Sequence, residues 1–173
     1  MRIIAGRWKG HRLQPMKGRD VRPTTDRVRE SWMSALGSRV VAATVLDLFA
    51  GSGALGLEGL SRGAVSVVFV EQARSALSVI RANIDRLGAQ DGCTLVADDV
   101  FRFLSRLPEP VDIAFADPPY NTGTATRLVE VYRSRPFAKE LWLEHPFRET
   151  LPFPDGVKTR RYGDSALTTL TTD

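Results

Sequence analysis

Short apolar runs alternate with helix-forming stretches from residue 44 onward, and this alternation limits the fold more than any other feature of the sequence. Five mostly apolar runs lie at residues 45–49, 67–70, 94–96, 111–115 and 141–143. Helical patterns separate them at about residues 53–62, 73–88, 100–107 and 124–135. Runs that are apolar throughout suit strands buried on both faces of a parallel sheet. The alternation therefore predicts a doubly wound α/β domain.

The C-terminal part of the sequence departs from this alternation. Two extended stretches, residues 157–162 and 166–170, flank a Gly163-Asp164-Ser165 turn. This pattern predicts an antiparallel hairpin that closes the sheet. The expected domain, residues 24–173, therefore has a mostly parallel sheet with antiparallel strands at its end.

The N-terminal part is predicted to form a small separate element. Two short stretches flank a glycine-bounded segment, at residues 3–5, 6–10 and 11–13. This arrangement favours a β-hairpin. The linker that follows runs into a helix that Thr25 or Asp26 can cap. We assign residues 1–23 to an N-terminal arm.

Positive charge is concentrated in this arm and the start of the helix. Residues 1–30 carry nine Lys and Arg and three Asp and Glu, whereas the rest of the chain carries 15 and 17. A local basic patch is the expected footprint of a polyanionic partner, and the alternative is a solvated arm that binds nothing. We assign RNA contacts to side chains of this region: Arg7, Trp8, Lys9, Arg12, Arg22 and Arg27. For Trp8, stacking on a base is the prediction, and packing of the arm onto the domain is the alternative.

A glycine-rich loop follows the first apolar run and opens the next helix. Its sequence, DLFAGSGALG over residues 47–56, lets backbone approach a ligand closely and offers the free N–H groups of a helix N-terminus. Glu71 lies twenty residues after Gly51, at the end of the second run, where a carboxylate can bind both hydroxyls of a ribose. The loop therefore predicts a cofactor that contains a nucleoside.

Two cofactor classes fit the loop. Residues 51–56 match G-x-G-x-x-G, the dinucleotide fingerprint. S-adenosylmethionine (SAM) is favoured because Asp47 precedes the loop, where its carboxylate could face the cofactor's ammonium group or order water near it. Asp99 follows the third run, where it could accept from an adenine amino group. The alternative for Asp98 and Asp99 is the N-cap of the next helix.

The stretch FADPPY, residues 115–120, follows the fourth run and has the composition of a socket for a planar amine. The lone pair of an exocyclic base amine is delocalised into the ring, so the nitrogen is a poor nucleophile. The Asp117 carboxylate and the Pro118 carbonyl can each accept one N–H, which aims the lone pair at a methyl donor. Pro118 and Pro119 stiffen these acceptors, and Tyr120 offers a face on which the base can stack. The base must be unpaired or flipped to reach the socket.

The chain resembles known methyltransferases in these motifs. Asp117-Pro118-Pro119-Tyr120 after a fourth strand, with Asp47-x-Phe49-x-Gly51-x-Gly53 after a first, resembles the SAM-dependent amino-methyltransferases of nucleic acids. Three further stretches are similar, more narrowly, to the RsmD family of bacterial 16S rRNA (guanine-N2)-methyltransferases: RIIAGRWKGHRL at 2–13, RPTTDRVRE at 22–30 and RRYGDSALTTL at 160–170.

The resemblance implies a seven-stranded Rossmann-like fold with an N-terminal RNA-binding hairpin. It implies transfer of methyl from SAM to N2 of a guanine in 16S rRNA, within an assembling or assembled small ribosomal subunit. The residues that match the catalytic tetrad are Asp117, Pro118, Pro119 and Tyr120, and those that match the cofactor site are Asp47, Phe49, Gly51, Gly53, Glu71 and Asp99. Residues 144–146 depart mildly from the family pattern and receive no role.

Composition disfavours several other classes of protein. A single cysteine, Cys93, rules out an internal disulfide and a cysteine-based metal cluster, and we expect no metal. No apolar run approaches the ~20 residues of a membrane span. The N-terminus MRIIAGRWKGHR lacks the apolar segment of a secretory signal. We therefore expect a cytoplasmic monomer that does not contact membranes.

Three other functions are open from the residues alone. A DNA amino-methyltransferase acting on adenine N6 or cytosine N4 would use the same tetrad, although 173 residues leave no room for a large target-recognition domain. An NAD-dependent dehydrogenase would use the glycine fingerprint, but no constellation of catalytic His, Lys or Tyr supports it. A non-catalytic RNA-binding protein would not need Asp117. The tetrad recognises an amino group and a ring, so the choice of guanine comes from the resemblance.

Overall fold

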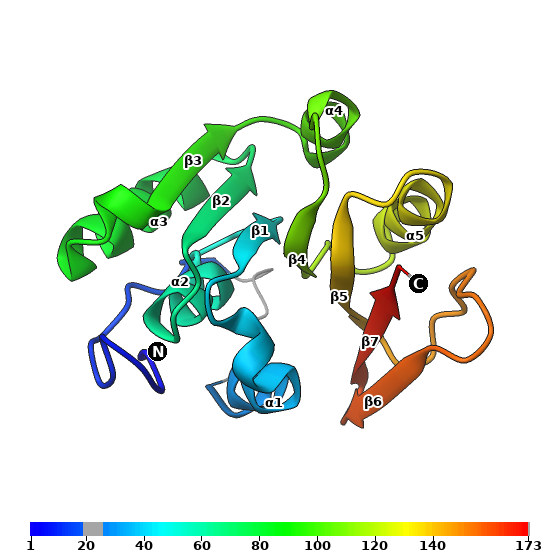
Figure 1. The fold of residues 1–173 in the computed structure, drawn as a ribbon, viewed down its shortest axis with the longest axis horizontal. Coiled ribbons are helices and arrows are strands. Elements are labelled where there is room, and N and C mark those ends of the chain that lie inside the picture. Colours follow the sequence, from blue (N-terminus) through cyan, green and yellow to red (C-terminus); the bar gives the residue numbers. More distant parts are fainter. Residues whose placement is uncertain (19–25, 173) are drawn as a thin grey trace.

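The computed structural model describes residues 1–18 and 26–172, which form one layered α/β unit (Figure 1). The strands are β1 (Thr44–Leu48), β2 (Ser66–Glu71), β3 (Cys93–Ala97), β4 (Val111–Ala116), β5 (Ala138–Pro146), β6 (Lys158–Tyr162) and β7 (Ser165–Thr171). The α-helices are α1 (Asp26–Leu36), α2 (Ala54–Ser61), α3 (Arg74–Leu87), α4 (Val100–Arg106) and α5 (Thr124–Ser134). Two short 3₁₀ helices, Gly37–Val40 and Gln90–Gly92, precede β1 and β3.

All seven strands belong to a single sheet with the order β3-β2-β1-β4-β5-β7-β6. Strands β1 to β5 pair in parallel, and β7 is antiparallel to both β5 and β6. The predicted parallel α/β sheet and its antiparallel C-terminal hairpin are therefore confirmed. The chain leaves β1 toward β2 on one side and later returns to β4 on the other, so the strand order reverses between β1 and β4.

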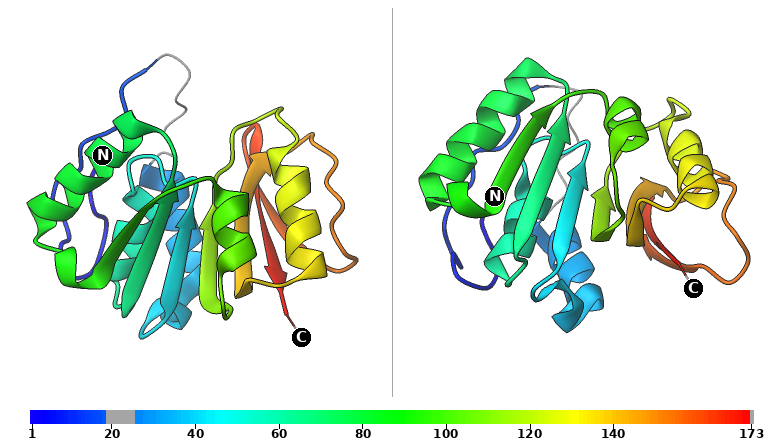
Figure 2. Two further views of the ribbon diagram at one scale, coloured as in Figure 1. Left: turned by 90° about the horizontal axis from the view of Figure 1, so that it is seen from above. Right: turned by 45° about the horizontal axis from the view of Figure 1, so that its top comes forward.

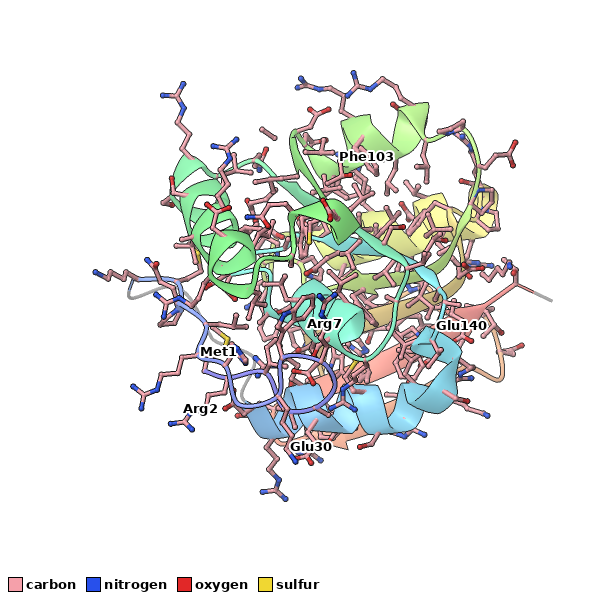
Figure 3. All side chains as sticks on the ribbon, turned by 60° about the vertical axis from the view of Figure 1, so that its left-hand side comes forward. Met1, Arg2, Arg7, Glu30, Phe103 and Glu140 are labelled. Atoms are coloured by element: carbon pink, nitrogen blue, oxygen red, sulfur yellow. The ribbon has the colours of Figure 1, made fainter. Side chains whose placement is uncertain are left out.

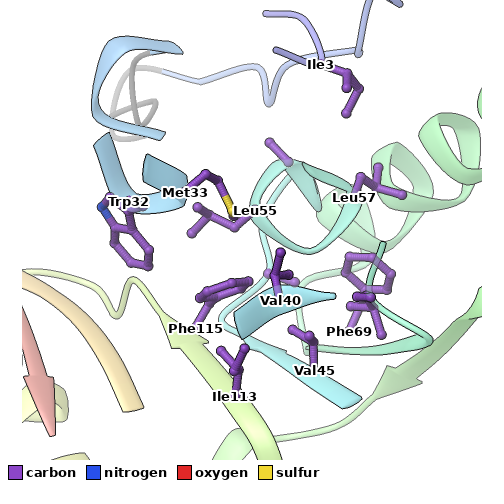
Figure 4. Packing of buried hydrophobic residues seen from close by; sticks show 14 of the residues in the cluster. Ile3, Trp32, Met33, Val40, Val45, Leu55, Leu57, Phe69, Ile113 and Phe115 are labelled. Carbon is purple, nitrogen blue, oxygen red and sulfur yellow. The ribbon is translucent and has the colours of Figure 1, made fainter. Parts of the chain in front are cut away.

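Helices cover both faces of the sheet, as Figure 2 shows. One buried cluster joins α1, α2 and α3 to the first face. Figure 4 shows Trp32 of α1 and Leu57 of α2 in this cluster, and Ile80 of α3 belongs to it as well. A second cluster joins α4 and α5 to the other face through residues such as Leu104 and Leu128. Adjacent strand residues fall in different clusters because side chains alternate along a strand. This two-sided burial explains why the strands read as continuous apolar runs.

The N-terminal segment differs from its prediction, because residues 1–18 form no two-stranded hairpin. A single antiparallel bridge joins Arg2 and Arg12. The backbone donors that would extend a ladder are used elsewhere: Ile4 N and Ala5 N donate to the carboxylate of Glu58 on α2, at 2.9 and 3.1 Å. Backbone bonds within the segment, from Ile3 N to His11 O and from Leu13 N to Met1 O, both at 3.0 Å, stop at this point. Beyond Ile3 the segment is bonded to α2.

Apolar side chains anchor the same segment to the domain. Ile3, Trp8 and Leu13 are buried and belong to the cluster on the α1–α2–α3 face. Residues 1–18 therefore share the core of the α/β unit, and the expected separate appendage is corrected on this point. The expected boundary at residue 23 and the predicted cap Thr25 lie outside the described residues.

Candidate active site

A cavity of about 530 Å³ opens where β1, β2, β4 and β5 end. Residues from these four strand ends, from the end of β3 and from the N-terminal segment line it: Met1, Met16, Asp47, Phe49, Ala50, Gly51, Ser52, Ala54, Leu55, Val70, Glu71, Gln72, Asp98, Asp99, Val100, Asp117, Pro118, Pro119, Tyr120 and Glu144. In open α/β sheets, ligands bind outside the carboxyl ends of the strands where the strand order reverses. The cavity lies at this point of the sheet.

The cavity is acidic. Six carboxylates line it, those of Asp47, Glu71, Asp98, Asp99, Asp117 and Glu144, and among the described residues no Lys or Arg does. A nicotinamide dinucleotide would place a negatively charged pyrophosphate here, against like charges. A cationic ligand with an ammonium and a sulfonium group would meet opposite charges instead. The acidic lining of the cavity therefore fits SAM and disfavours a dinucleotide.

The glycine loop takes its shape from left-handed backbone conformations. Phe49 and Gly51 have φ values of 57° and 56°, and both line the cavity. This conformation is uncommon for a residue with a side chain and occurs preferentially at functional sites. Gly53, with φ of 78°, is the N-cap of α2 and is not among the lining residues. Gly53 thus starts the helix, whereas Phe49 and Gly51 form the cavity wall.

Gly56, the third glycine of the fingerprint, allows α2 to lie against the sheet. A Cβ at this position would come within 2.5 Å of the Phe69 ring and 2.7 Å of Val67. It would also meet the Asp47 carboxylate at 2.9 Å. Close helix–strand packing is the role of the third glycine in this motif.

Asp47 lies on β1 beneath the loop and is only 2% exposed. Its Oδ2 accepts a hydrogen bond from Gly56 N at 2.9 Å. Burial raises the pKa of Asp47 to about 8, and the negative charges of Asp117 and Glu71 add to this effect. Asp47 is therefore a buried acid that a nearby cation would help to ionise.

Glu71 ends β2 and holds the loop in place. Its Oε2 accepts from Gly51 N at 3.0 Å, and its Oε1 accepts from Gln72 N and Ala73 N, both at 2.9 Å. A carboxylate has about four lone-pair sites. Glu71 can therefore fix the backbone and still accept from a ribose hydroxyl.

The two acids after β3, Asp98 and Asp99, make different contacts. Asp99 is the N-cap of α4, and its Oδ1 accepts from Arg102 N at 2.9 Å. Asp98 accepts from Asp99 N at 2.8 Å and forms ion pairs with Arg102 and Arg106. The capping alternative thus holds for Asp99. The cap occupies one oxygen, so it is compatible with the adenine contact assigned to this side chain.

The tetrad at residues 117–120 lies between β4 and α5 and lines the same cavity as the glycine loop. Pro118 is buried, and Tyr120 is half-buried. The Tyr120 hydroxyl donates to Glu144 Oε1 at 3.2 Å. Glu144 stands at the carboxyl end of β5 and is 5% exposed. This residue received no role from the sequence, although an acid that ends an apolar run next to two other strand-end acids was an available signal.

The residues assigned to RNA lie outside the cavity. Arg7, Lys9, Arg12 and Arg27 are exposed, and Figure 3 shows the segment that carries Arg7 between α1 and α2. Trp8 is 8% exposed and packs in the core. The predicted stacking role of Trp8 is corrected, because the buried indole has no open face for a base. Arg22 lies outside the described residues.

Clusters of metal ligands and membrane-spanning helices are both absent from residues 1–18 and 26–172. No group of three or more His, Cys, Asp or Glu in this part of the chain could hold a metal ion. No described helix is both long and apolar enough to cross a membrane.

Known proteins are similar to this chain in both sequence and fold. The family model "Conserved hypothetical protein 95" matches residues 1–170. Ribosomal RNA small subunit methyltransferase D from Escherichia coli K12 is 41% identical over 123 residues, which are 71% of this chain and 62% of that protein. The matched part thus spans less than two thirds of that relative.

Solved structures agree with this assignment. A hypothetical protein from Thermus thermophilus is 30% identical over 99% of both chains, with a TM-score of 0.87. The 16S rRNA N2 methyltransferase RsmC of T. thermophilus, solved with AdoMet and guanosine, is 22% identical over 88% of this chain and 44% of that one. Its TM-score of 0.65 shows a shared fold. The chain therefore belongs to the Conserved hypothetical protein 95 family, and its resemblance to the ribosomal RNA small subunit methyltransferases D is confirmed.

Proposed function

We propose that this chain transfers a methyl group from SAM to N2 of a guanine in 16S rRNA, in an assembling or assembled small ribosomal subunit. One observation carries the proposal: the Asp117–Tyr120 tetrad and the glycine loop line the same acidic cavity. The names of the relatives support the choice of rRNA and of the small subunit.

The cofactor would be held by residues of the loop and the neighbouring strand ends. Glu71 would bind the ribose, Asp99 the adenine amino group and Asp47 the ammonium group, while Phe49 and Gly51 would form the wall beside them. Gly53 would act indirectly by starting α2. When bound, SAM supplies the electrophilic methyl group.

The tetrad would prepare the base amine. The Asp117 carboxylate and the Pro118 carbonyl each accept one N–H of the guanine amine, which draws the nitrogen toward a tetrahedral shape. Pro119 holds Pro118 in an extended conformation. Asp117 then takes the proton that the nitrogen loses. Each of these steps depends on positioning of the amine.

Tyr120 would hold the base ring by stacking, which contributes about 1–3 kcal/mol per base. The hydrogen bond from its hydroxyl to Glu144 Oε1 restrains the orientation of the phenol ring. Glu144 is therefore proposed as a positioning residue that acts through Tyr120.

Exposed basic residues would hold the RNA backbone. We assign phosphate contacts to Arg7, Lys9, Arg12 and Arg27, and also to Arg22. Residues 1–23 would serve as an RNA-binding arm that is fastened to the methyltransferase domain, residues 24–173. We further propose that the protein acts in the cytoplasm as a monomer, which sedimentation of the purified chain with and without rRNA would test.

Mass spectrometry of rRNA nucleosides tests the proposal directly. A strain that lacks the protein should lose N2-methylguanosine at one site of 16S rRNA, and the wild-type gene should restore it. Asp117→Ala should fail to restore the modification although the variant remains folded and binds SAM in calorimetry. Unchanged rRNA with loss of N6-methyladenine or N4-methylcytosine from DNA would instead identify a DNA amino-methyltransferase.

A further inference from the structure

Strand β6 forms an exposed basic edge of the sheet. Its sequence, KTRRY, contains three basic residues and no acid, and Lys158, Thr159, Arg160 and Arg161 are all exposed. As the last strand in the order β3-β2-β1-β4-β5-β7-β6, it has a neighbour on one side only. Beyond residue 30, acidic residues outnumber basic residues in the chain as a whole, but within this strand all the charged residues are basic.

The positive charges of this edge are not neutralised by neighbouring acids. Within residues 1–18 and 26–172, no carboxylate forms an ion pair with Lys158, Arg160 or Arg161. The ion pairs of the described chain use other basic residues: Arg29, Arg39, Arg62, Arg102, Arg106 and Lys139. The β6 charges are therefore available to an external anion.

An exposed aromatic residue adjoins the same edge. Phe147 is 41% exposed, one of the few large apolar side chains on the surface. The guanidinium of Arg161 lies over its ring at 4.2 Å, and Arg161 Nε donates to Gly163 O at 2.8 Å. These contacts hold one face of the planar guanidinium in place. An ordered guanidinium loses less entropy when it binds a phosphate.

The register of the strands sets the distance from this edge to the cavity. Arg160 pairs with Leu167 of β7, which in turn pairs with Glu144 of β5. Neighbouring strands lie about 4.8 Å apart, so the Cα atoms of Arg160 and Glu144 are about 10 Å apart. Glu144 lines the cavity. The basic edge is thus within reach of RNA that flanks a base in the cavity.

The N-terminal segment and β6 lie on opposite sides of the site. Figure 2 (left) shows the N-terminal segment at one end of the sheet and the β6–β7 hairpin at the other. The cavity opens between them, at the ends of β1 and β4. An RNA strand that crosses the cavity from the arm would next meet β6.

We propose that the exposed edge of β6 is a second RNA-binding surface, which contacts backbone phosphates next to the target guanine. Lys158 and Arg160 flank this edge on one face of the sheet and Arg161 flanks it on the other, because side chains alternate along a strand. This inference rests on the proposed function and extends it, since RNA contacts were assigned only to the N-terminal region. Arginine suits the surface because its guanidinium binds phosphate in a bidentate manner.

The test is salt-dependent binding of small ribosomal subunits, isolated from a strain that lacks this protein, by the double variant Arg160→Ala/Arg161→Ala. Each lost phosphate contact should reduce the slope of log K against log salt by about 1, so the double variant should lose about 2. Arg86→Ala is the matched control, because Arg86 is exposed on α3 and is in no ion pair among the described residues. Its slope should stay within about 0.3 of the wild-type value.

The outcomes separate this inference from the proposed function. If the wild type methylates guanine and the double variant keeps both its affinity and its salt slope, the β6 surface is not an RNA contact. If the double variant self-associates in size-exclusion chromatography while RNA binding is unchanged, the basic side chains protect a sheet edge instead, and the inference is overturned. If the wild type neither binds nor methylates the small ribosomal subunits, the proposed function fails, and the inference fails with it. SAM affinity should be equal in all three proteins.

Discussion

Glu58 fastens the N-terminal segment to the domain, and Glu58→Gln should release that segment. The side chain is fully buried on α2. Its two oxygens accept from Ile4 N at 2.9 Å, from Ala5 N at 3.1 Å and from Arg62 Nε at 2.8 Å. Its Oε2 also lies 3.9 Å from Nε of Arg29, which is equally buried. Glutamine keeps the size of the side chain but has one acceptor oxygen instead of two.

The expected cost follows from these contacts. Each carboxylate oxygen accepts one backbone N–H, so an amide must turn its NH₂ group toward Ile4 or Ala5. A buried N–H left without an acceptor costs about 1–3 kcal/mol. Arg29 also loses a buried counter-charge, although it keeps its ion pair with Asp26 Oδ1 at 3.0 Å. Together with the unpaired N–H, the cost is about 3–5 kcal/mol, the range for a buried pair broken from one side. For a protein of this size, this loss corresponds to a fall in Tm of roughly 6–20 °C.

Urea unfolding and hydrogen exchange would measure the two effects separately. The free energy of unfolding should fall by about 3–5 kcal/mol, and the amides of Ile4 and Ala5 should exchange faster in the folded protein. Glu130→Gln is the control, because Glu130 is exposed on α5 and should change stability by less than about 0.5 kcal/mol. A loss below about 1 kcal/mol, with Ile4 and Ala5 still protected, would refute the role of Glu58 as the anchor of the arm.

Three further predictions concern the cavity and its support. Asp47 has a pKa of about 8 in the folded protein, so it keeps a proton that the unfolded chain releases near pH 3.8. The free energy of unfolding of the wild type, relative to that of Asp47→Asn, should therefore fall as pH rises between these values. Urea unfolding of both proteins from pH 5 to pH 9 would check this, and a difference that stays flat or rises would contradict it. Tyr120→Phe keeps the ring but loses the bond to Glu144, so kcat should fall by roughly 2- to 12-fold while SAM affinity is unchanged; steady-state kinetics and calorimetry would decide, and an unchanged kcat would remove the positioning role. Gly56→Ala should cost about 1–3 kcal/mol by overpacking α2 against Phe69; thermal unfolding would show it, and an unchanged Tm would mean that the helix can shift.

The sheet was predictable because its signal is local and repeated. The inner parallel strands β1, β2, β4 and β5 are largely buried on both faces, so most residues of their runs are apolar, and the run itself reveals the strand. Strand β3, at the edge of the sheet, is only partly buried. Asp47 breaks this rule within β1, and the structure shows it beneath the glycine loop, bonded to Gly56 N. The Gly163-Asp164-Ser165 turn likewise carried enough local chemistry to specify the C-terminal hairpin.

The N-terminal segment was mispredicted because its partners are distant in the chain. Its glycine-bounded pattern is that of a hairpin, but Ile4 bonds to Glu58, 54 positions away. Trp8 stands between Arg7 and Lys9, a context typical of RNA contact, yet its backbone N donates to Ser61 Oγ at 3.0 Å and its ring enters the core. No local sequence pattern distinguishes an aromatic ring that stacks on RNA from one that packs against α2.

The distribution of charge links the cavity, the arm and β6 on the proposed function. RNA, a polyanion, and SAM, a cationic cofactor, must each bind at its own site on the same small protein. Six acidic side chains line the cavity, and the described lining includes no Lys or Arg, so phosphates are repelled by the ionised acids among them. Exposed arginines and lysines lie outside the cavity, among them those of the N-terminal segment and of β6. The backbone is thus held outside, and only an uncharged base can enter the cavity, which is the geometry that base flipping requires.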